Sequence, residues 1–543
     1  MSDSQSNPQT SPRPGSVAAP ARAGLLRSTA VFTAMTFLSR ITGLVRDMLQ
    51  AHLFGAGAAT DAFVIAYRIP NYLRRIFAEG SFSSAFVPVF SALRERGDPV
   101  ALKDFLDHVA GALSAVVLIV TALGMFAAPA IIAFMAPGTL NEPDTFRLAS
   151  DLLRIVFPYL FFISLTALAA GVLNSFSRFG LPAVTPVLHN LTVILAMLLL
   201  AGRFAVPIEA LAWGVLLAGA LQWAVLWPAL RRHGLWPRLR FNFANEGVRR
   251  VFRLMLPTLF SSSVAQLNLI VGTIFASLLV TGSQTWLYLS DRLIEFPLGL
   301  FGVALATVIL PHLSRRFAAD DGDGYGHALD WGLRTVLLIG IPAGLGLWVL
   351  AEPLTVSLYV SGQFSGHDAR MAAWSLAAMS VGVPAFMLTK VLLSAFYARQ
   401  DTLAPMRAAI RTVLANVVLT IALTTPLWLG GIEGGHVGIA LASGLAGIVN
   451  AALLWRELAR IGVYRPQPGW VWHLARLAIA AAAMTTAVWL ARTAIGDWIA
   501  IGLAGRWFWL LALVALGGAV YGMTLLALGW RPSELRYREP LQR

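Results

Sequence analysis

Long apolar segments separated by short polar loops run through almost the whole chain. A helix rises 1.5 Å per residue, so roughly twenty apolar residues cross the ~30 Å hydrocarbon core of a bilayer. This pattern predicts an all-α polytopic membrane protein with about fourteen transmembrane helices. The predicted spans are residues 28–54, 59–91, 106–135, 147–176, 183–202, 207–230, 248–281, 284–314, 328–351, 369–398, 405–428, 434–458, 470–492 and 504–529.

Composition strengthens this interpretation. The 543 residues are 57% hydrophobic and 13% charged, and the mean hydropathy is +0.70. Soluble domains are about half apolar and a quarter charged, so a soluble fold is excluded. The chain has no cysteine, which excludes disulfides, thiolate metal sites and a cysteine nucleophile.

The positive charge lies mostly in alternate loops. A formal charge of +14 would suggest nucleic acid as a partner of a soluble protein, but in a membrane protein Lys and Arg mark the cytoplasmic loops. Both tails are on the basic side, which requires an even number of crossings. We therefore expect both termini in the cytoplasm and no nucleic-acid partner.

An internal similarity suggests two repeated halves. Residues 172–186 resemble residues 392–405, and each stretch joins one predicted helix to the next on the basic side. The spacing gives a unit of six helices, and two parallel six-helix lobes are a recurrent transporter architecture. Alternatively, Pro and Arg simply recur at helix ends. The predicted divisions are a disordered tail (1–24), two six-helix lobes (25–240 and 241–465), two additional helices (466–530) and a second tail (531–543).

Charged residues within the apolar segments are the candidate functional groups. Each charge at mid-membrane costs about 2.5–3.5 kcal/mol even on a lenient scale, so these groups must face protein, water or one another. Three segments carry them: Arg40, Arg46 and Asp47; Asp61, Arg68, Arg74, Arg75 and Glu79; and Asp291, Arg292 and Glu295.

Helical geometry brings part of this set together. Asp61, Arg68, Arg75 and Glu79 lie within about 40° of one line on an ideal helix, and this face is predicted to look into a cleft. Arg74 lies off that line, but Pro70 makes the register beyond it uncertain.

Two explanations of these charges remain open. They could pair between helices to lock the bundle, or snorkel to the interface. Alternatively, the guanidinium groups form a cationic patch for an anion, and Arg suits phosphate because its planar fork donates two parallel hydrogen bonds. Lys390, alone in segment 369–398, is a further candidate contact.

Specific runs point to a family. The run RIPNYLRRIFAEGSFSSAFVPVF at 68–90, preceded by SRITGLVRD and GAGAATDAF, closely resembles the MurJ (MviN) family of lipid II flippases. Residues 171–190, 288–314 and 389–407 are similar to further recurring segments of that family.

The resemblance implies a fold of the multidrug, oligosaccharidyl-lipid and polysaccharide exporter type, with two extra helices associated with a groove for the lipid tail. It also implies that lipid II, the undecaprenyl-diphosphate-linked peptidoglycan precursor, moves from the cytoplasmic to the periplasmic leaflet of the bacterial inner membrane by alternating access. Membrane lipids and proteins of cell-wall synthesis and division are the other expected partners. By resemblance the substrate-binding residues are Arg40, Arg46, Asp61, Arg74, Asp291 and Glu295, and the gate or support residues are Arg75, Glu79 and Arg292. Arg68, on the charged helical face, and Lys390 are further gate or support candidates from the charge pattern itself.

Other chemistry finds little support in the sequence. Some members of the family are thought to use a sodium site, yet no Asp or Glu occurs in 247–290 or 402–432. No GxxxxGK[ST] phosphate-binding loop is present, and we expect no cofactor, no metal and no enzymatic activity. The alternatives are an exporter of a drug or of another undecaprenyl-linked oligosaccharide, and a membrane enzyme or scaffold of cell-wall synthesis.

Overall fold

The computed structural model describes residues 19–75, 82–232, 234–431, 433–535 and 537. Over these residues the chain is helical, and its only β-type pairing is an isolated bridge between Ser361 and Phe364. The helices are α1 (Ala19–Phe54), α2 (Ala58–Arg74), α3 (Phe82–Glu95), α4 (Pro99–Phe126), α5 (Ala128–Met135), η2 (Pro137–Asn141), α6 (Pro143–Val156), α7 (Tyr159–Ser175), α8 (Gly180–Leu200), η3 (Ala201–Arg203), α9 (Glu209–Arg232), α10 (Glu246–Ser277), α11 (Ser283–Pro297), η4 (Leu298–Gly302), α12 (Val303–Ala318), α13 (Gly322–Val349), α14 (Ala351–Tyr359), α15 (Gly366–Ser380), α16 (Val383–Ala398), α17 (Leu403–Leu429), α18 (Gly435–Arg460), α19 (Trp470–Ile495), α20 (Leu503–Ala527) and η5 (Pro532–Leu535).

The all-α membrane class predicted from the sequence is confirmed. Among the described residues, ten helices are long and apolar enough to cross a membrane, or eleven when the bent pair α15–α16 counts as one span. Three further predicted spans coincide with α1, with α2 and α3, and with α10. At 17 and 14 residues, α2 and α3 are each shorter than the roughly twenty residues of a full span, so helix length and hydropathy support eleven spans among the described residues and not fourteen.

Several predicted spans are broken helices, and proline lies at the breaks. Pro158 separates α6 from α7, and α15 meets α16 at an angle of 46°, with a proline in the first turn of α16. Pro297 ends α11 and is followed by the single π-helical turn η4. Proline lacks an amide donor and clashes with the preceding turn, which accounts for these bends.

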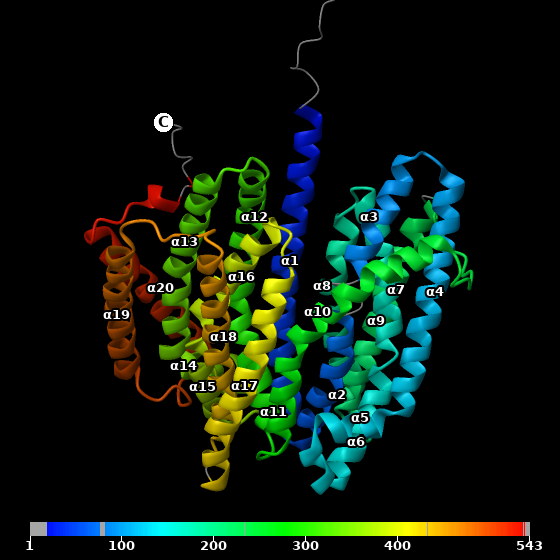
Figure 1. The fold of residues 1–543 in the computed structure, drawn as a ribbon. Coiled ribbons are helices and arrows are strands. Elements are labelled where there is room, and N and C mark those ends of the chain that lie inside the picture. The colour runs from blue at the N-terminus through cyan, green and yellow to red at the C-terminus, as the bar shows by residue number, and fades with distance from the viewer. Residues whose placement is uncertain (1–18, 76–81, 233, 432, 536, 538–543) are drawn as a thin grey trace, which may run out of the picture.

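Buried apolar side chains form two large clusters. One draws on the helices from α2 to α9 and on the first turns of α10; the other draws on α11 to α18 with parts of α1, α19 and α20. Figure 1 shows the corresponding bundles, with α1 and α10 running between them and α19 at the outer edge. The start of α1 and η5 lie at the same end of the molecule, here called the terminal end.

The two similar stretches noted in the sequence end their helices in the same way. Ser177 and Gln400 adopt positive φ angles of 59° and 58°. In each stretch the next amide donates to the carbonyl five residues back, as in a Schellman cap: Arg178 N to Leu173 O (2.9 Å) and Asp401 N to Phe396 O (3.0 Å).

Candidate functional site

Two adjoining cavities lie between the bundles. The arginine chamber, of about 330 Å³, is lined by α1, α2, α7, α8, α9 and α11, and its charged residues are Arg40, Arg46, Asp47, Arg74, Arg75, Arg292 and Glu295. The mixed chamber, of about 430 Å³, is lined mainly by α2, α10, α11, α16, α17 and α18. Asn71, Arg75, Arg292 and Glu295 line both chambers and form the partition between them.

Arg46 is the most deeply buried cation of the arginine chamber, with 7% of its surface exposed. Its guanidinium donates to Asp47 Oδ1 at 2.6 and 3.0 Å, to Asn190 Oδ1 at 3.2 Å and to the Tyr288 hydroxyl at 3.3 Å. A buried charge requires a partner and further hydrogen bonds to be tolerated. Helices α1, α8 and α11 together supply them, and Arg46 is thereby held at the chamber wall.

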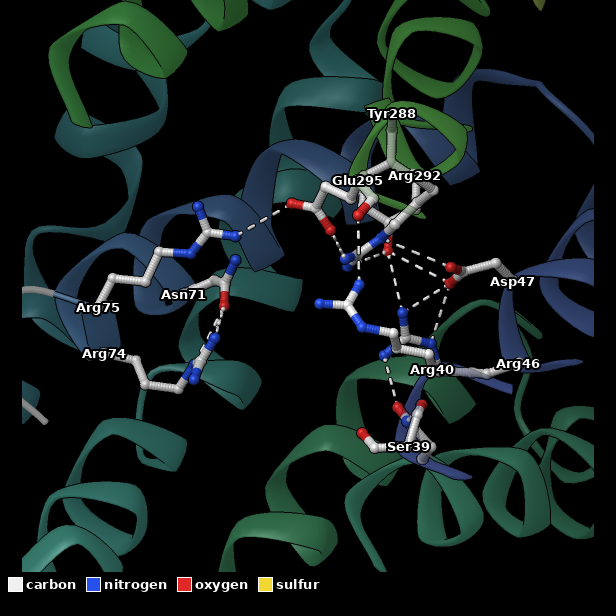
Figure 2. A network of polar contacts seen from close by, with 11 residues as sticks. Ser39, Arg40, Arg46, Asp47, Asn71, Arg74, Arg75, Tyr288, Arg292 and Glu295 are labelled. Carbon is white, nitrogen blue, oxygen red and sulfur yellow. Dashed lines mark hydrogen bonds and ion pairs between the residues drawn. The ribbon is translucent and has the colours of Figure 1, made fainter. Parts of the chain in front are cut away.

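Glu295 connects the cations of the partition. Its carboxylate accepts from Arg292 Nη1 at 3.0 Å and lies 3.5 Å from Arg75 Nη2, while its backbone carbonyl accepts from Arg40 Nη1 at 3.3 Å. Figure 2 shows Arg75 approaching the carboxylate of Glu295 from one direction and Arg40 approaching the same residue from another. Glu295 thus contacts three arginines, Arg292 and Arg75 through its carboxylate and Arg40 through its backbone carbonyl.

Arg292 links this carboxylate to the buried pair. Its Nη2 donates to the Tyr288 hydroxyl at 3.1 Å, its Nε lies 3.5 Å from Asp47 Oδ2, and its guanidinium carbon is 5.0 Å from the centre of the Tyr288 ring. The ion pair of Arg292 with Glu295 follows the i, i+3 spacing seen in the sequence. Figure 2 shows Arg46, Asp47, Tyr288 and Arg292 as one connected network.

The remaining basic candidates also line the chambers. Arg74 donates to Asn71 Oδ1 at 2.9 Å in the arginine chamber. Arg68 donates to Thr273 Oγ1 at 2.9 Å and to Gln284 Oε1 at 2.8 Å in the mixed chamber. Asp291 and Lys390 line the mixed chamber as well, and within the described ranges neither forms an ion pair.

Asp61 lies away from both chambers, although it was predicted to share their face. It accepts hydrogen bonds from Gly282 N (2.7 Å), Thr285 N (2.9 Å) and Thr285 Oγ1 (2.6 Å) at the start of α11. A carboxylate there is favoured by free amides and by the helix dipole. Asp61 therefore fastens α2 to α11. Glu79, the last member of the predicted stripe, lies outside the described residues.

Other contacts join the bundles at the end opposite the terminal end. Gln363 N donates to the carbonyl of His52 at 2.9 Å, and Gly138 N donates to Ser277 Oγ at 3.2 Å. Together with the Asp61 contacts, they connect the end of α1 to the loop before α15, η2 to the end of α10, and the first turn of α2 to the start of α11. Figure 1 shows these segments at the end away from η5. We call this set of contacts the distal joint.

The chambers suit recognition of an anion more than metal chemistry. In the arginine chamber five arginines face two carboxylates, so an excess of cationic donors surrounds the space. Across the described part of the chain, no three His, Cys, Asp or Glu side chains come together as metal ligands. Guanidinium groups held on several helices match the oxygens of a phosphate or diphosphate.

The sequence pattern did not predict which neutral polar side chains contact the arginines of the site. Asn71, Asn190 and Tyr288 orient the arginines, and Asp47 was noted as a charge without a role. Their signal was present, because a polar side chain inside an apolar segment is costly unless it has a partner. The sequence alone did not say which of them would meet an arginine from another helix.

Comparisons with known proteins agree with this architecture. The sequence pattern of the family described as "Lipid II flippase MurJ" matches residues 50–506. A probable lipid II flippase MurJ of Vibrio cholerae is 42% identical over 519 residues, covering 94% of this chain and 98% of that protein. The lipid II flippase MurJ of Burkholderia cenocepacia is 40% identical over 465 residues, covering 84% and 88%.

Solved structures give the same result. A lipid II flippase MurJ in an inward closed conformation superimposes with a TM-score of 0.76 at 27% identity, over 91% of this chain and 98% of the other. An inward-facing multidrug transporter of the MATE family has a TM-score of 0.62 at 12% identity, over 80% and 98%, which shows the shared fold alone. On the family match and these relatives, the chain belongs to the lipid II flippase MurJ family.

Proposed function

We propose that this protein moves lipid II from the cytoplasmic to the periplasmic leaflet of the bacterial inner membrane by alternating access, as a transporter and not as an enzyme. The observation that carries the proposal is the arginine chamber, a cationic cavity between two helical bundles of a membrane protein. Its relatives are named for the same substrate. The competing exporter, enzyme and scaffold hypotheses have no comparable support.

The chamber offers a site for the diphosphate of lipid II. We assign direct contacts to Arg40, Arg46 and Arg74, which line the arginine chamber. Asp291 and Arg68 stay candidates for contacts in the mixed chamber, and Arg75, Arg292 and Glu295 act as the partition. In this proposal Asp61 acts on the conformational change through the distal joint, and not on the substrate.

The proposed transport step is an exchange of partners. A diphosphate that enters the arginine chamber competes with Glu295 for Arg75 and Arg292. Since a ligand shifts a conformational equilibrium only through different contacts in the two states, this exchange is the means by which the substrate favours one state. The polyprenyl tail stays in the lipid while the two lobes rock around the headgroup.

We further propose fourteen crossings, with α1, the pair α2–α3 and α10 added to the eleven apolar spans. Two lobes (25–240 and 241–465) are followed by two extra helices (466–530), and both tails face the cytoplasm. An even number of crossings agrees with the shared terminal end. Because the chain has no cysteine, single cysteines placed in successive loops and tested with an impermeant thiol reagent would check this topology.

The test of function is access to lipid II from outside the cell. In cells that depend on this protein, its depletion should remove the lipid II that an externally added hydrolase can cleave. Arg40→Met should fail to restore that pool, whereas Arg203→Met, a change of an exposed arginine in η3, should restore it. Undiminished external lipid II after depletion would refute the flippase and favour an enzyme or a scaffold.

A further inference from the structure

The connection between the two bundles is attached to the side of α4. We call residues 234–244, which join α9 to α10, the strap; apart from turns at its two ends it has no regular secondary structure. The buried carboxylate of Asp107 accepts from Arg238 N at 2.7 Å, and the carbonyl of Asp107 accepts from Arg240 N at 3.3 Å. The side chain of Arg240 also donates to Asp104 Oδ1 at 2.7 Å. Both the backbone and one side chain of the strap are therefore held by α4.

Gly111 allows the backbones of α4 and the strap to touch. A Cβ atom at this position would lie 2.2 Å from the carbonyl oxygen of Arg240 and 2.7 Å from its nitrogen, closer than a side chain tolerates. Glycine is the residue that permits such an approach. The strap therefore lies directly on the helix and moves with the N-terminal bundle.

The two sides of the strap differ in chemistry. Successive side chains of an extended segment point in opposite directions, and here basic and apolar residues alternate in the order Arg238, Leu239, Arg240 and Phe241. Arg240 reaches α4 through its ion pair, which directs the apolar side away from that helix. Leu239, Phe241 and Phe243 are all exposed, and Phe241 exposes 65% of its surface. Exposed apolar side chains grouped in this way mark a surface that another molecule covers.

The place where the strap is attached corresponds to the edge of the hydrocarbon layer. Helix α4 is continuous from Pro99 to Phe126, and roughly twenty residues of helix cross the core of a bilayer. Counted back from Phe126, that length ends near Asp107, which holds the strap. Figure 1 shows the green connection beside α4 at the outer edge of the bundle. The strap consequently lies at the level of the lipid headgroups.

The chain around the strap is strongly basic. From Arg231 to Arg253 it contains seven arginines and a single acidic residue, Glu246. Aromatic rings prefer the level of the headgroups, and arginines there are attracted to acidic phospholipids. Depth, exposed apolar side chains and positive charge together fit the headgroup layer of a membrane better than a soluble protein.

We propose that the strap binds the headgroup layer of the cytoplasmic leaflet. Its apolar side enters the layer with Leu239, Phe241 and Phe243, and the neighbouring arginines bind the phosphates of acidic phospholipids. The ligand is the leaflet itself and not the transported lipid, so the surface is separate from the two chambers. Because the strap is fastened to α4, the acidic leaflet holds the N-terminal bundle at a fixed depth. The inference uses the proposed topology and is independent of the substrate.

Quenching of a single fluorophore in the full-length protein tests the depth of the strap. The chain has no cysteine, so Phe241→Cys provides one site for an environment-sensitive dye. In vesicles of phosphatidylcholine and phosphatidylglycerol in equal amounts, lipids with a nitroxide near the headgroup should quench this dye, and acrylamide in the water should not. The control is Val100→Cys, exposed in the first turn of α4 and about 10 Å nearer the start of that helix. Its dye should be quenched by acrylamide and not by the lipids.

The preference for acidic lipid is tested with two quenchers that differ only in the headgroup. Nitroxide-labelled phosphatidylglycerol should quench the dye at 241 more strongly than labelled phosphatidylcholine. Arg238→Gln keeps the backbone hydrogen bond to Asp107 and should lower this preference about fivefold, which corresponds to about 1 kcal/mol for one arginine. Arg203→Gln, a change of an exposed arginine in η3, should leave it unchanged. If the label at 241 prevents folding, Phe243→Cys carries the same comparisons.

Two results would overturn the inference. Quenching of the dye at 241 by acrylamide, as strong as at 100, would place the strap in water and leave its apolar side for a soluble partner. Equal quenching by the two labelled lipids would show that the arginines do not select acidic phospholipid. Neither result touches the proposed transport of lipid II, which the external hydrolase tests separately.

Discussion

Asp61→Asn tests the distal joint with the smallest change of shape. Asp61 is 7% exposed, and its two carboxylate oxygens accept three hydrogen bonds from Gly282 and Thr285. The asparagine side chain keeps one acceptor oxygen. Its NH₂ group then faces the N–H of Gly282 or Thr285, so two donors point at each other. The lost charge-assisted bond is worth about 1.5–3 kcal/mol, and the attraction to the start of α11 adds up to about 2 kcal/mol.

These terms overlap, so we expect a combined cost of about 2–4 kcal/mol to closure of the distal joint. At 1.4 kcal/mol per factor of ten, the ratio of closed to open joint falls roughly 30- to 700-fold. We expect the closed joint to predominate in the native protein and the open joint to reach a measurable fraction of molecules in the variant. Lipid II transport should fall because the alternating cycle loses one of its end states.

Distance measurements between spin labels report this change directly. The native chain has no cysteine, so Asn141→Cys and Glu433→Cys provide the only label sites; both residues are exposed, Asn141 ends η2 and Glu433 lies 3.8 Å from His367 at the start of α15. In the labelled protein with Asp61 unchanged, the distance between the two labels should have one narrow distribution. Asp61→Asn should add a population at longer distance.

The control is Asp151→Asn, which removes an exposed carboxylate paired with Arg154 within α6. It should leave the distribution unchanged. If Asp61→Asn also leaves both the distribution and transport unchanged, the hydrogen bonds at the start of α11 do not hold the joint, and the reasoning is wrong.

Three further changes give expected outcomes. Arg74→Ala should abolish export of lipid II while the protein stays in the membrane, and Arg74→Lys should retain part of it because a point charge replaces the fork; both are read as lipid II cleavable from outside. Glu295→Gln should tighten binding of undecaprenyl diphosphate severalfold, because Arg75 and Arg292 lose a competing carboxylate, yet slow transport; weaker binding would contradict the partition role. Arg506 donates to the carbonyls of Val360, Trp498, Ile499 and Ile501, so Arg506→Leu should lower the free energy of unfolding by about 3 kcal/mol, seen as a lower thermal midpoint by tryptophan fluorescence; an unchanged midpoint would show that this loop does not limit stability.

The sequence predicted the helical class because hydropathy alone decides which segments prefer lipid. It was less informative where charge and apolar character mix, as in α1 and the pair α2–α3. It also predicted single spans where Pro158 and Pro297 divide the helices. A proline marks a possible break, but the packing of neighbouring helices decides whether the chain bends there.

The site could be predicted as a set of residues but not as a set of contacts. Helical periodicity placed Asp61, Arg68 and Arg75 on one line, and all three do face other helices. Periodicity cannot show that Asp61 meets backbone amides of α11 while Arg75 meets Glu295, since those partners lie more than 200 residues away. Arg74, which an ideal helix puts off the line, lines the arginine chamber all the same.

The two connections between the bundles differ in strength, and this difference constrains the mechanism. The pair Arg75–Glu295 spans 3.5 Å between side chains that are 34% and 44% exposed, and such pairs contribute at most about 1 kcal/mol. A diphosphate can therefore break the partition with little of its binding free energy. In the distal joint, the Asp61 contacts are buried and alone are worth about 2–4 kcal/mol. To open the distal joint, the substrate must bind the open-joint state roughly 30- to 700-fold more tightly than the closed one.

Contacts with the diphosphate alone are present as soon as the headgroup enters, so the additional affinity has to come from groups that engage later. Arg68 and Lys390 line the mixed chamber beyond the partition, so this reasoning predicts that the complete headgroup, and not the diphosphate, is the trigger for transport.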